Sequence, residues 1–212
     1  MKKLLFLGDS ITDSHRLWLP DDPDGLGDGF VKMISDSLQN QNETLQIINR
    51  GHDGLTLPHL IRNLERDCFC LKPDVITVLI GINDVGVSMQ TGVSLEAQQF
   101  EQQFFHLTEM LCKHTDADLL FMAPFIFPHP REYMNWIPET LVAETVIQKA
   151  AARYQTPFCP LHDSLNKMAG EYGYDTLTID GIHPTRFGAE CIRDKWLSLY
   201  RGSFSDGLSS HF

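Results

Sequence analysis

The chain has 212 residues, of which 42% are hydrophobic and 21% are charged, a composition that indicates a globular domain and excludes disordered and fibrous proteins. Its formal net charge of −11 repels phosphate backbones and anionic lipids, so we expect neither a nucleic-acid nor a membrane partner. The first apolar run stops at Gly8, too early for a signal peptide. Five scattered cysteines are typical of reduced thiols, so we expect a cytoplasmic protein without a structural metal.

Along the chain, short apolar runs alternate with stretches of helical period. The expected strands cover residues 3–7, 45–49, 75–80, 119–123 and 157–161. The expected helices lie near residues 30–38, 57–68, 100–111 (with Ser94 as N-cap), 142–150 (after Pro138) and 189–199. This alternation predicts an α/β fold with a mostly parallel, five-stranded sheet and helices on both faces. With no repeat or linker, we expect a single domain over residues 1–201 and a flexible tail over residues 202–212.

Glycine and short polar residues follow four of the five expected strands. "GDS" occupies residues 8–10, "NRGHDG" residues 49–54 and "GIND" residues 81–84, while "DGIHP" at residues 180–184 precedes the last expected helix. In an open parallel sheet, ligands bind beyond the carboxyl ends of the strands. The four blocks are therefore expected to meet in one site.

The residue types in these blocks are those of nucleophilic catalysis. A serine hydroxyl becomes a nucleophile when a histidine, oriented by a carboxylate, takes its proton. Ser10 has candidate partners in His183 and Asp180, whose three-residue spacing lets both side chains point the same way. The amides of Ser10 and Gly54 and the side chain of Asn83 could bind the oxyanion of a tetrahedral intermediate.

The four blocks together resemble the motifs of the SGNH hydrolases, also called GDSL-type esterases. "GDSITD", "NRGHDG", "GIND" and "DGIHP" occur in the order of that family and span about the whole domain. The resemblance implies a three-layer, flavodoxin-like fold and ester hydrolysis without a cofactor. By position, it implies that Ser10 is the nucleophile, His183 the base and Asp180 its partner. It also matches Gly54 and Asn83 to oxyanion donors.

A finer resemblance links the chain to the branch of intracellular acetylxylan esterases. "GDSITDSHR", "GLGDGFV" at residues 25–31, "KPDVITVLIGINDV" at 72–85 and "MAPF" at 122–125 are similar to that branch and imply removal of acetyl groups from a carbohydrate. The second block differs, because His52 and Asp53 stand where that branch has Ile and Ser. Both are candidate pocket residues.

Two long loops, 14–28 and 125–138, are expected near the site, because loops of this length are often functional. Their Trp18 and Trp136 are candidates for stacking on a sugar ring or for hydrophobic lids. The expected partner is thus a small-molecule or oligosaccharide ester. The oligomeric state is not predicted.

Other functions remain open at this point. A lysophospholipase or thioesterase would use the same site on a different acyl ester. A metallophosphoesterase also carries Gly-Asp and Gly-His strings at strand ends, but its opening Asp-x-His pair is absent directly after the first expected strand, where residues 9–11 read Asp-Ser-Ile. A non-catalytic carbohydrate-binding protein on the same fold is a further alternative, although Ser10, Asp180 and His183 are all present.

Overall fold

The computed structural model describes residues 1–18, 24–39 and 45–204. Within them, five strands form one sheet in the order β2-β1-β3-β4-β5, and every neighbouring pair is parallel. The strands are β1 (Lys2–Gly8), β2 (Leu45–Gly51), β3 (Val75–Leu79), β4 (Asp118–Met122) and β5 (Phe158–Cys159). The sheet confirms the predicted fold class, and its order is that of flavodoxin-like proteins.

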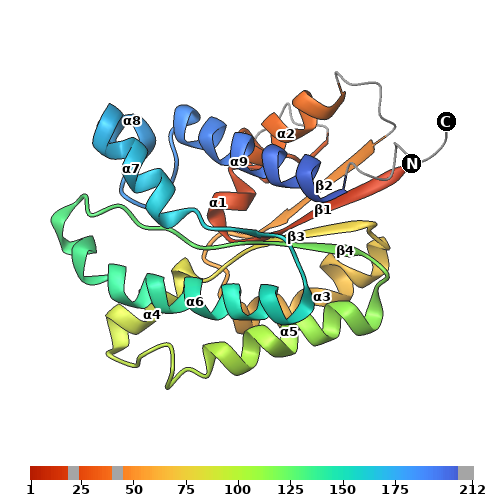
Figure 1. Ribbon diagram of the computed structural model, residues 1–212, viewed down its shortest axis with the longest axis horizontal. Coiled ribbons are helices and arrows are strands. Elements are labelled where there is room, and N and C mark those ends of the chain that lie inside the picture. The colour runs from red at the N-terminus through yellow and green to blue at the C-terminus, as the bar shows by residue number, and fades with distance from the viewer. Residues whose placement is uncertain (19–23, 40–44, 205–212) are drawn as a thin grey trace.

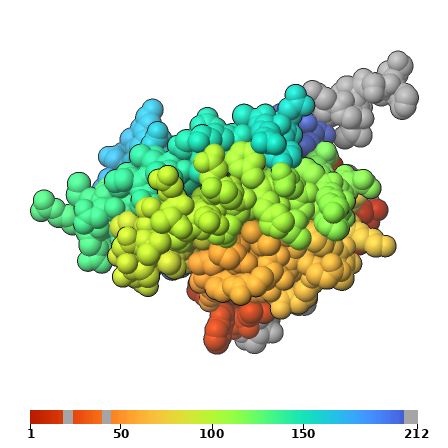
Figure 2. All heavy atoms as spheres, turned by 90° about the horizontal axis from the view of Figure 1, so that it is seen from below, coloured from red at the N-terminus to blue at the C-terminus, as the bar shows by residue number. Residues whose placement is uncertain are grey.

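Helices cover both faces of the sheet and give the molecule three layers (Figure 1). One layer contains α1 (Ser10–Asp13), α2 (Phe30–Gln39) and α9 (Arg186–Phe204), with α7 (His162–Tyr172) and α8 (Tyr174–Leu177) beside them. The other layer contains α3 (Leu57–Asp67), α4 (Ile82–Thr91), α5 (Phe100–His114) and α6 (Ile137–Tyr154). Short 3₁₀ turns cover Phe69–Leu71 and Arg131–Asn135. In Figure 2, α3, α5 and α6 lie side by side over the second face.

Aromatic side chains join the layers on both faces of the sheet. Phe6 of β1 packs against Phe30 of α2 and Trp196 of α9, with ring centroids 6.0 and 5.3 Å apart. On the other side, Phe121 of β4 meets Phe104 of α5 at 5.2 Å. These side chains are fully buried, and each such burial stabilises the fold by roughly 2–3 kcal/mol. The continuous apolar runs of the strands are thus explained by burial from two sides.

The order in which strands join the sheet changes direction at β1: β2 lies on one side of β1 and β3 lies on the other. This switch point determines where the site lies. From β1 the chain first crosses to β2 on one side, and β3 then pairs with β1 on the other side. Such a switch point leaves a crevice beyond the carboxyl ends of the two strands, where loops can meet over a ligand. Ser10 follows β1 directly at this crevice.

Three local expectations differ from the structure. The fifth strand is only the two residues Phe158–Cys159, because only Phe121 and Met122 pair with it. Ser94 does not cap α5, since its hydroxyl accepts a hydrogen bond from the amide of Ala97 (3.2 Å) in a preceding turn. The last helix continues to Phe204, so residues 202–204 are helical. The remainder of the expected tail lies outside the described residues.

Among the described helices, none has the length and apolarity needed to cross a bilayer.

Candidate active site

Ser10 is the first residue of α1 and stands directly beyond the end of β1. Asp9 is the N-cap of this short helix, and its Oδ1 accepts a hydrogen bond from the amide of Ile11 (3.1 Å). The hydroxyl of Ser10 lies 2.9 Å from Nε2 of His183, across 173 residues of chain. The turn from strand to helix thus carries the nucleophile candidate to the expected base.

The helix that carries Ser10 is packed tightly against the end of β2. A Cβ atom added to Gly51 would lie 2.2 Å from the amide nitrogen of Asp13, so only glycine allows this approach. Asn49, two residues earlier, is buried, and its Nδ2 donates to the carbonyls of Thr12 (2.7 Å) and Leu26 (2.9 Å). Its Oδ1 accepts from the amide of Gly51 (2.9 Å). Asn49 opens the second block, yet sequence reasoning assigned it no role, because its partners are distant backbone carbonyls.

The turn that carries Asp180 and His183 brings both side chains to Ser10. Asp180 Oδ2 lies 2.6 Å from Nδ1 of His183, and Oδ1 accepts from the amides of Ile182 (2.9 Å) and His183 (2.8 Å). Thr178 supports the turn, because its hydroxyl donates to the carbonyl of His183 (2.9 Å) and accepts from the amide of Gly181 (2.8 Å). Burial alone would raise the pKa of Asp180, but the hydrogen bonds from His183 and Ile182 outweigh it and lower that pKa.

The predicted oxyanion donors share one cleft with these three side chains. The cleft has a volume of about 990 Å³, and Ser10, Gly54, Asn83, Asp180 and His183 all line it. Gly54 has φ of +67°, which favours glycine, and a Cβ atom built there would meet open space. Asn83 lies in the first turn of α4, and its Nδ2 donates to the carbonyl of Leu55 (3.1 Å). That bond ties Asn83 to the loop that carries Gly54.

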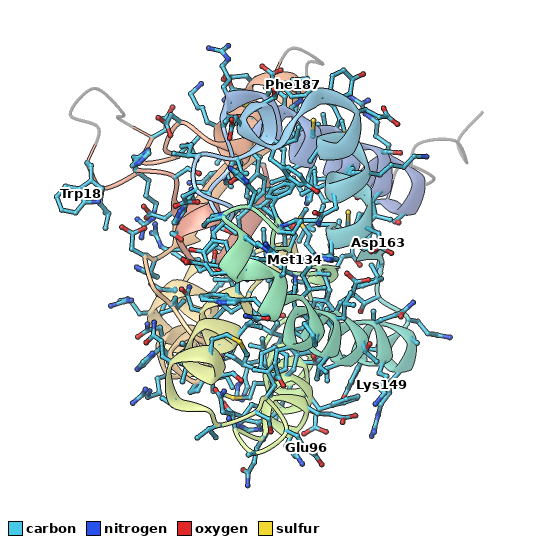
Figure 3. All side chains as sticks on the ribbon, turned by 90° about the vertical axis from the view of Figure 1, so that its left-hand side faces the viewer. Trp18, Glu96, Met134, Lys149, Asp163 and Phe187 are labelled. Carbon is cyan, nitrogen blue, oxygen red and sulfur yellow. The ribbon has the colours of Figure 1, made fainter. Side chains whose placement is uncertain are left out.

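The four candidate pocket residues lie in different places. Asp53 lines the cleft, whereas His52 is not among the lining residues and contacts Arg16 and Asp67. The side chain of Trp18 is at the outer edge of the molecule in Figure 3, and the residue is 74% exposed. Trp136 is half-buried and packs edge-on against Tyr133, with ring centroids 4.8 Å apart, and it is not among the residues that line the cleft. Residues 19–23 of the predicted 14–28 loop lie outside the described part.

Two buried carboxylates, those of Asp9 and Asp84, are next in the chain to Ser10 and Asn83. Burial raises the pKa of Asp9 to about 7, with a further contribution from the charge of Asp84. Burial likewise raises the pKa of Asp84 to about 7, against hydrogen bonds from the backbone. Both oxygens of Asp84 accept from the amide of Leu57 (3.1 Å each), the first residue of α3. Asp84 therefore caps α3 from a neighbouring helix, a structural role that no sequence pattern indicated.

Within residues 1–18, 24–39 and 45–204, no three His, Cys, Asp or Glu side chains gather in a group that could hold a metal ion. The polar groups of the cleft are instead arranged in series: a hydroxyl, an imidazole and a carboxylate. This series is the arrangement by which serine hydrolases activate their nucleophile.

Comparison with known proteins identifies the family. Residues 6–191 match the GDSL-like lipase/acylhydrolase family, so the chain belongs to that family, whose members are classed as carboxylic ester hydrolases.

The similar proteins include esterases. The chain is 39% identical over 92 residues to an acetylxylan esterase of Geobacillus stearothermophilus, a match that spans 40% of either protein. The crystal structure of Axe2, an acetylxylan esterase from the same organism, superposes with a TM-score of 0.78 at 24% identity over 93% of both chains. The crystal structure of LAE5, an alpha/beta hydrolase enzyme from the metagenome of Lake Arreo in Spain, superposes with a TM-score of 0.81 at 23% identity over 93% of this chain and 94% of its own. At these identities, the two structures support the fold.

Proposed function

We propose that this protein hydrolyses short acyl esters, acetyl esters of a carbohydrate in particular, through Ser10, His183 and Asp180. The observation that carries the proposal is the pair of hydrogen bonds that joins these side chains, 2.9 Å from Ser10 to His183 and 2.6 Å from His183 to Asp180. The family membership and the acetylxylan esterases among the similar proteins support the ester class.

In the first half of the reaction, Ser10 Oγ forms a bond to the acyl carbon while its proton moves to Nε2 of His183. Asp180, ionised because its pKa is lowered, accepts a hydrogen bond from the N–H at Nδ1 and stabilises the imidazolium. The tetrahedral intermediate then collapses: the bond from carbon to the leaving oxygen breaks, and that oxygen takes the proton from His183. An acyl-serine remains, and the alcohol leaves.

In the second half, a water molecule attacks the acyl-serine and gives its proton to His183. The bond to Ser10 Oγ breaks, the serine recovers a proton, and the carboxylic acid leaves. In both halves the negative oxygen is bound by the amides of Ser10 and Gly54 and by the side chain of Asn83. A primary amide carries two hydrogens. With one donated to the carbonyl of Leu55, the other is available for the oxyanion.

The cleft favours a polar alcohol as the leaving group. Besides the catalytic residues, Asp28, Asp53, Thr185 and Arg186 present side chains that can bind sugar hydroxyls, and a cleft of about 990 Å³ has room for a sugar ring. All five cysteines, each within the described residues, are free thiols, which suits the cytoplasm. We therefore place the substrate among acetylated sugars or short oligosaccharides of that compartment.

One lining residue favours a second candidate. Ile179 is 73% exposed beside Asp180, so it offers apolar surface to a longer acyl chain, as in a lysophospholipase or thioesterase. A series of p-nitrophenyl esters from acetate to decanoate separates the two. The acetyl proposal expects the highest kcat/KM for acetate, followed by activity on acetylated oligosaccharides, whereas a maximum at long chains would replace it.

The mechanism is tested with p-nitrophenyl acetate in the presence of EDTA. We expect wild-type hydrolysis to persist with the chelator and to vanish in Ser10→Ala. Asn83→Ala should lower kcat about 10²–10³-fold, the usual effect of losing one oxyanion donor. Activity that requires added manganese would favour a metallophosphoesterase, and the absence of any hydrolysis by a folded wild type would favour a carbohydrate-binding protein.

A further inference from the structure

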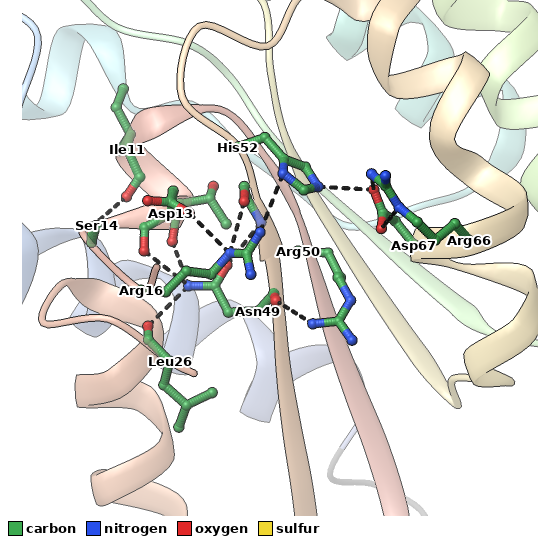
Figure 4. A network of polar contacts seen from close by, with 12 residues as sticks. Ile11, Asp13, Ser14, Arg16, Leu26, Asn49, Arg50, His52, Arg66 and Asp67 are labelled. Atoms are coloured by element: carbon green, nitrogen blue, oxygen red, sulfur yellow. Dashed lines mark hydrogen bonds and ion pairs between the residues drawn. The ribbon is translucent and has the colours of Figure 1, made fainter. Parts of the chain in front are cut away.

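His52 is not among the residues that line the cleft, and its imidazole lies between two charged side chains from different parts of the chain (Figure 4). Its Nδ1 is 3.2 Å from a terminal guanidinium nitrogen of Arg16, and its Nε2 is 2.9 Å from Oδ2 of Asp67 at the end of α3. A guanidinium can only donate, and a carboxylate can only accept. Both contacts are satisfied at once by the neutral imidazole that carries its hydrogen on Nε2.

Arg16 connects His52 to the helix that carries Ser10. Its Nε donates to the carbonyl of Gly51 (2.9 Å) and lies 2.9 Å from Oδ1 of Asp13, the last residue of α1. The hydrogen of Nε points at Gly51, so the contact with Asp13 is an ion pair without hydrogen-bond geometry. The side chain of Arg16 is only 7% exposed, so it is held in place between the two elements.

Asp67 provides a fixed anchor on the other side of His52. Arg66 donates two hydrogen bonds to it, one to each oxygen, both 2.7 Å long. Burial alone would raise the pKa of Asp67, but the hydrogen bonds from Arg66 and His52 outweigh it and lower that pKa. The carboxylate therefore stays charged and keeps accepting from His52 at neutral pH.

The backbone of His52 belongs to the turn that presents Gly54. The amide of His52 donates to the carbonyl of Gly8 (3.0 Å), and the amide of Leu55 donates to the carbonyl of His52 (3.1 Å). The main chain of this turn is therefore hydrogen-bonded to the end of β1, and the imidazole of His52 adds two side-chain contacts to it. One connection leads through Arg16 to α1, and the other leads through Asp67 to α3.

We propose that His52 is a positioning residue: with Arg16 and Asp67, it fixes the amide of Gly54 relative to that of Ser10. This inference rests on the proposed oxyanion hole. Two of its three donors belong to separate elements, the β2–α3 turn and α1, and the side-chain network joins those elements. Since a misplacement of about 1 Å in an active site can cost about 10²-fold in rate, such a network controls turnover without contacting the substrate.

The test compares His52→Ala with His106→Ala, whose side chain is exposed on α5. For H52A we expect kcat on p-nitrophenyl acetate to fall about 10–100-fold with KM within about twofold. The affinity for a phenylboronic acid, which forms a tetrahedral adduct with the serine, should weaken by a similar factor. H106A should retain wild-type values. Asp67→Ala should reproduce the loss, and the double variant should lose little more than either single one, because both act through one contact.

The conservative variant separates positioning from general support of the fold. His52→Gln retains an amide donor that can reach Asp67, so it should recover part of kcat, and it carries the test if H52A does not fold. The inference is overturned if kcat of these variants stays within twofold of wild type. A lower thermal midpoint with unchanged boronate affinity overturns it too. The proposed function fails separately, if Ser10→Ala or Asn83→Ala leaves turnover unchanged.

Discussion

Replacing Asn49 by alanine tests how α1, the short helix that begins at Ser10, is held in place. The side chain makes three hydrogen bonds of 2.7–2.9 Å, to the carbonyls of Thr12 and Leu26 and from the amide of Gly51, and the residue is 1% exposed. Alanine removes all three contacts in a place where water has little access. The buried carbonyls then lose donors for which the tight packing offers no replacement.

The expected loss follows from these contacts. A typical intramolecular hydrogen bond contributes about 1 kcal/mol, so three give a loss of about 3 kcal/mol in the free energy of unfolding. For a chain of this size, that loss lowers the thermal midpoint by roughly 6–12 °C. Because Thr12 lies two residues after Ser10 in α1, kcat should fall at least about tenfold as the hydroxyl leaves its position.

Urea unfolding followed by tryptophan fluorescence measures the free energy, and p-nitrophenyl acetate hydrolysis measures kcat. Asn49→Asp adds a sharper comparison: it keeps the shape but cannot donate when ionised, so it should be at least as harmful as alanine. Asn166→Ala is the matched control, because Asn166 on α7 also donates to two carbonyls, those of Ile126 (2.9 Å) and His162 (3.0 Å). It should lose stability while retaining kcat.

If Asn49→Ala changes the free energy of unfolding by less than about 0.5 kcal/mol, which is the effect of an ordinary surface substitution, the reasoning is refuted. Equal loss of kcat in Asn49→Ala and Asn166→Ala would also refute it, because activity would then follow stability alone. A fully active Asn49→Asp would mean that the amide does not donate to Thr12 and Leu26.

Three further predictions concern charge and packing. Asp180 should stay ionised as the pH is lowered to about 5, because the hydrogen bonds from His183 and Ile182 outweigh the effect of burial and lower its pKa; an Asp180 carboxyl found protonated at pH 5 from its carbon NMR shift would contradict this. Burial raises the pKa of Asp84 to about 7. The neutral carboxyl of Asp84 therefore contributes fully to the free energy of unfolding below about pH 4, and this contribution is lost as the pH rises from about 4 through 7. The free energy of unfolding should therefore fall over that window by up to about 4 kcal/mol in wild type relative to Asp84→Asn, and unfolding free energies of the two proteins that change equally between pH 4 and pH 8 in urea titrations would exclude this. Gly51→Ala places a Cβ 2.2 Å from the amide nitrogen of Asp13, so both stability and kcat should drop, and an unchanged thermal midpoint would show that α1 can move aside.

The fold class followed from periodicity alone, for a clear physical reason. Parallel strands covered on both faces are buried throughout and therefore mainly apolar, as residues 75–79 are with Thr77 as the polar exception, and amphipathic helices must repeat their apolar residues every three or four positions. These are local requirements, so they are visible in the sequence. The two-residue length of β5 was not visible, because pairing depends on how far its neighbour β4 extends alongside it.

The candidate site was only partly visible from the sequence. Ser10, Asp180 and His183 could be named because glycine and polar residues after buried strands are unusual, and the parallel fold brings strand ends together. The placement of Trp18 and Trp136 could not be predicted, because an aromatic residue in a long loop can face the cleft, the core or the solvent. Trp136 instead packs against Tyr133.

The sequence by itself determined the kinds of chemical group present and their order along the chain: a serine after the first strand, a histidine and an aspartate before the last helix. Only the tertiary structure decided which of these groups touch, since the hydrogen bond from Ser10 to His183 spans 173 residues. The same holds for Asn49, His52 and Asp84, whose partners lie on other elements. Hydrogen bonds depend on distance and direction in space, and local sequence patterns carry neither for residues far apart in the chain.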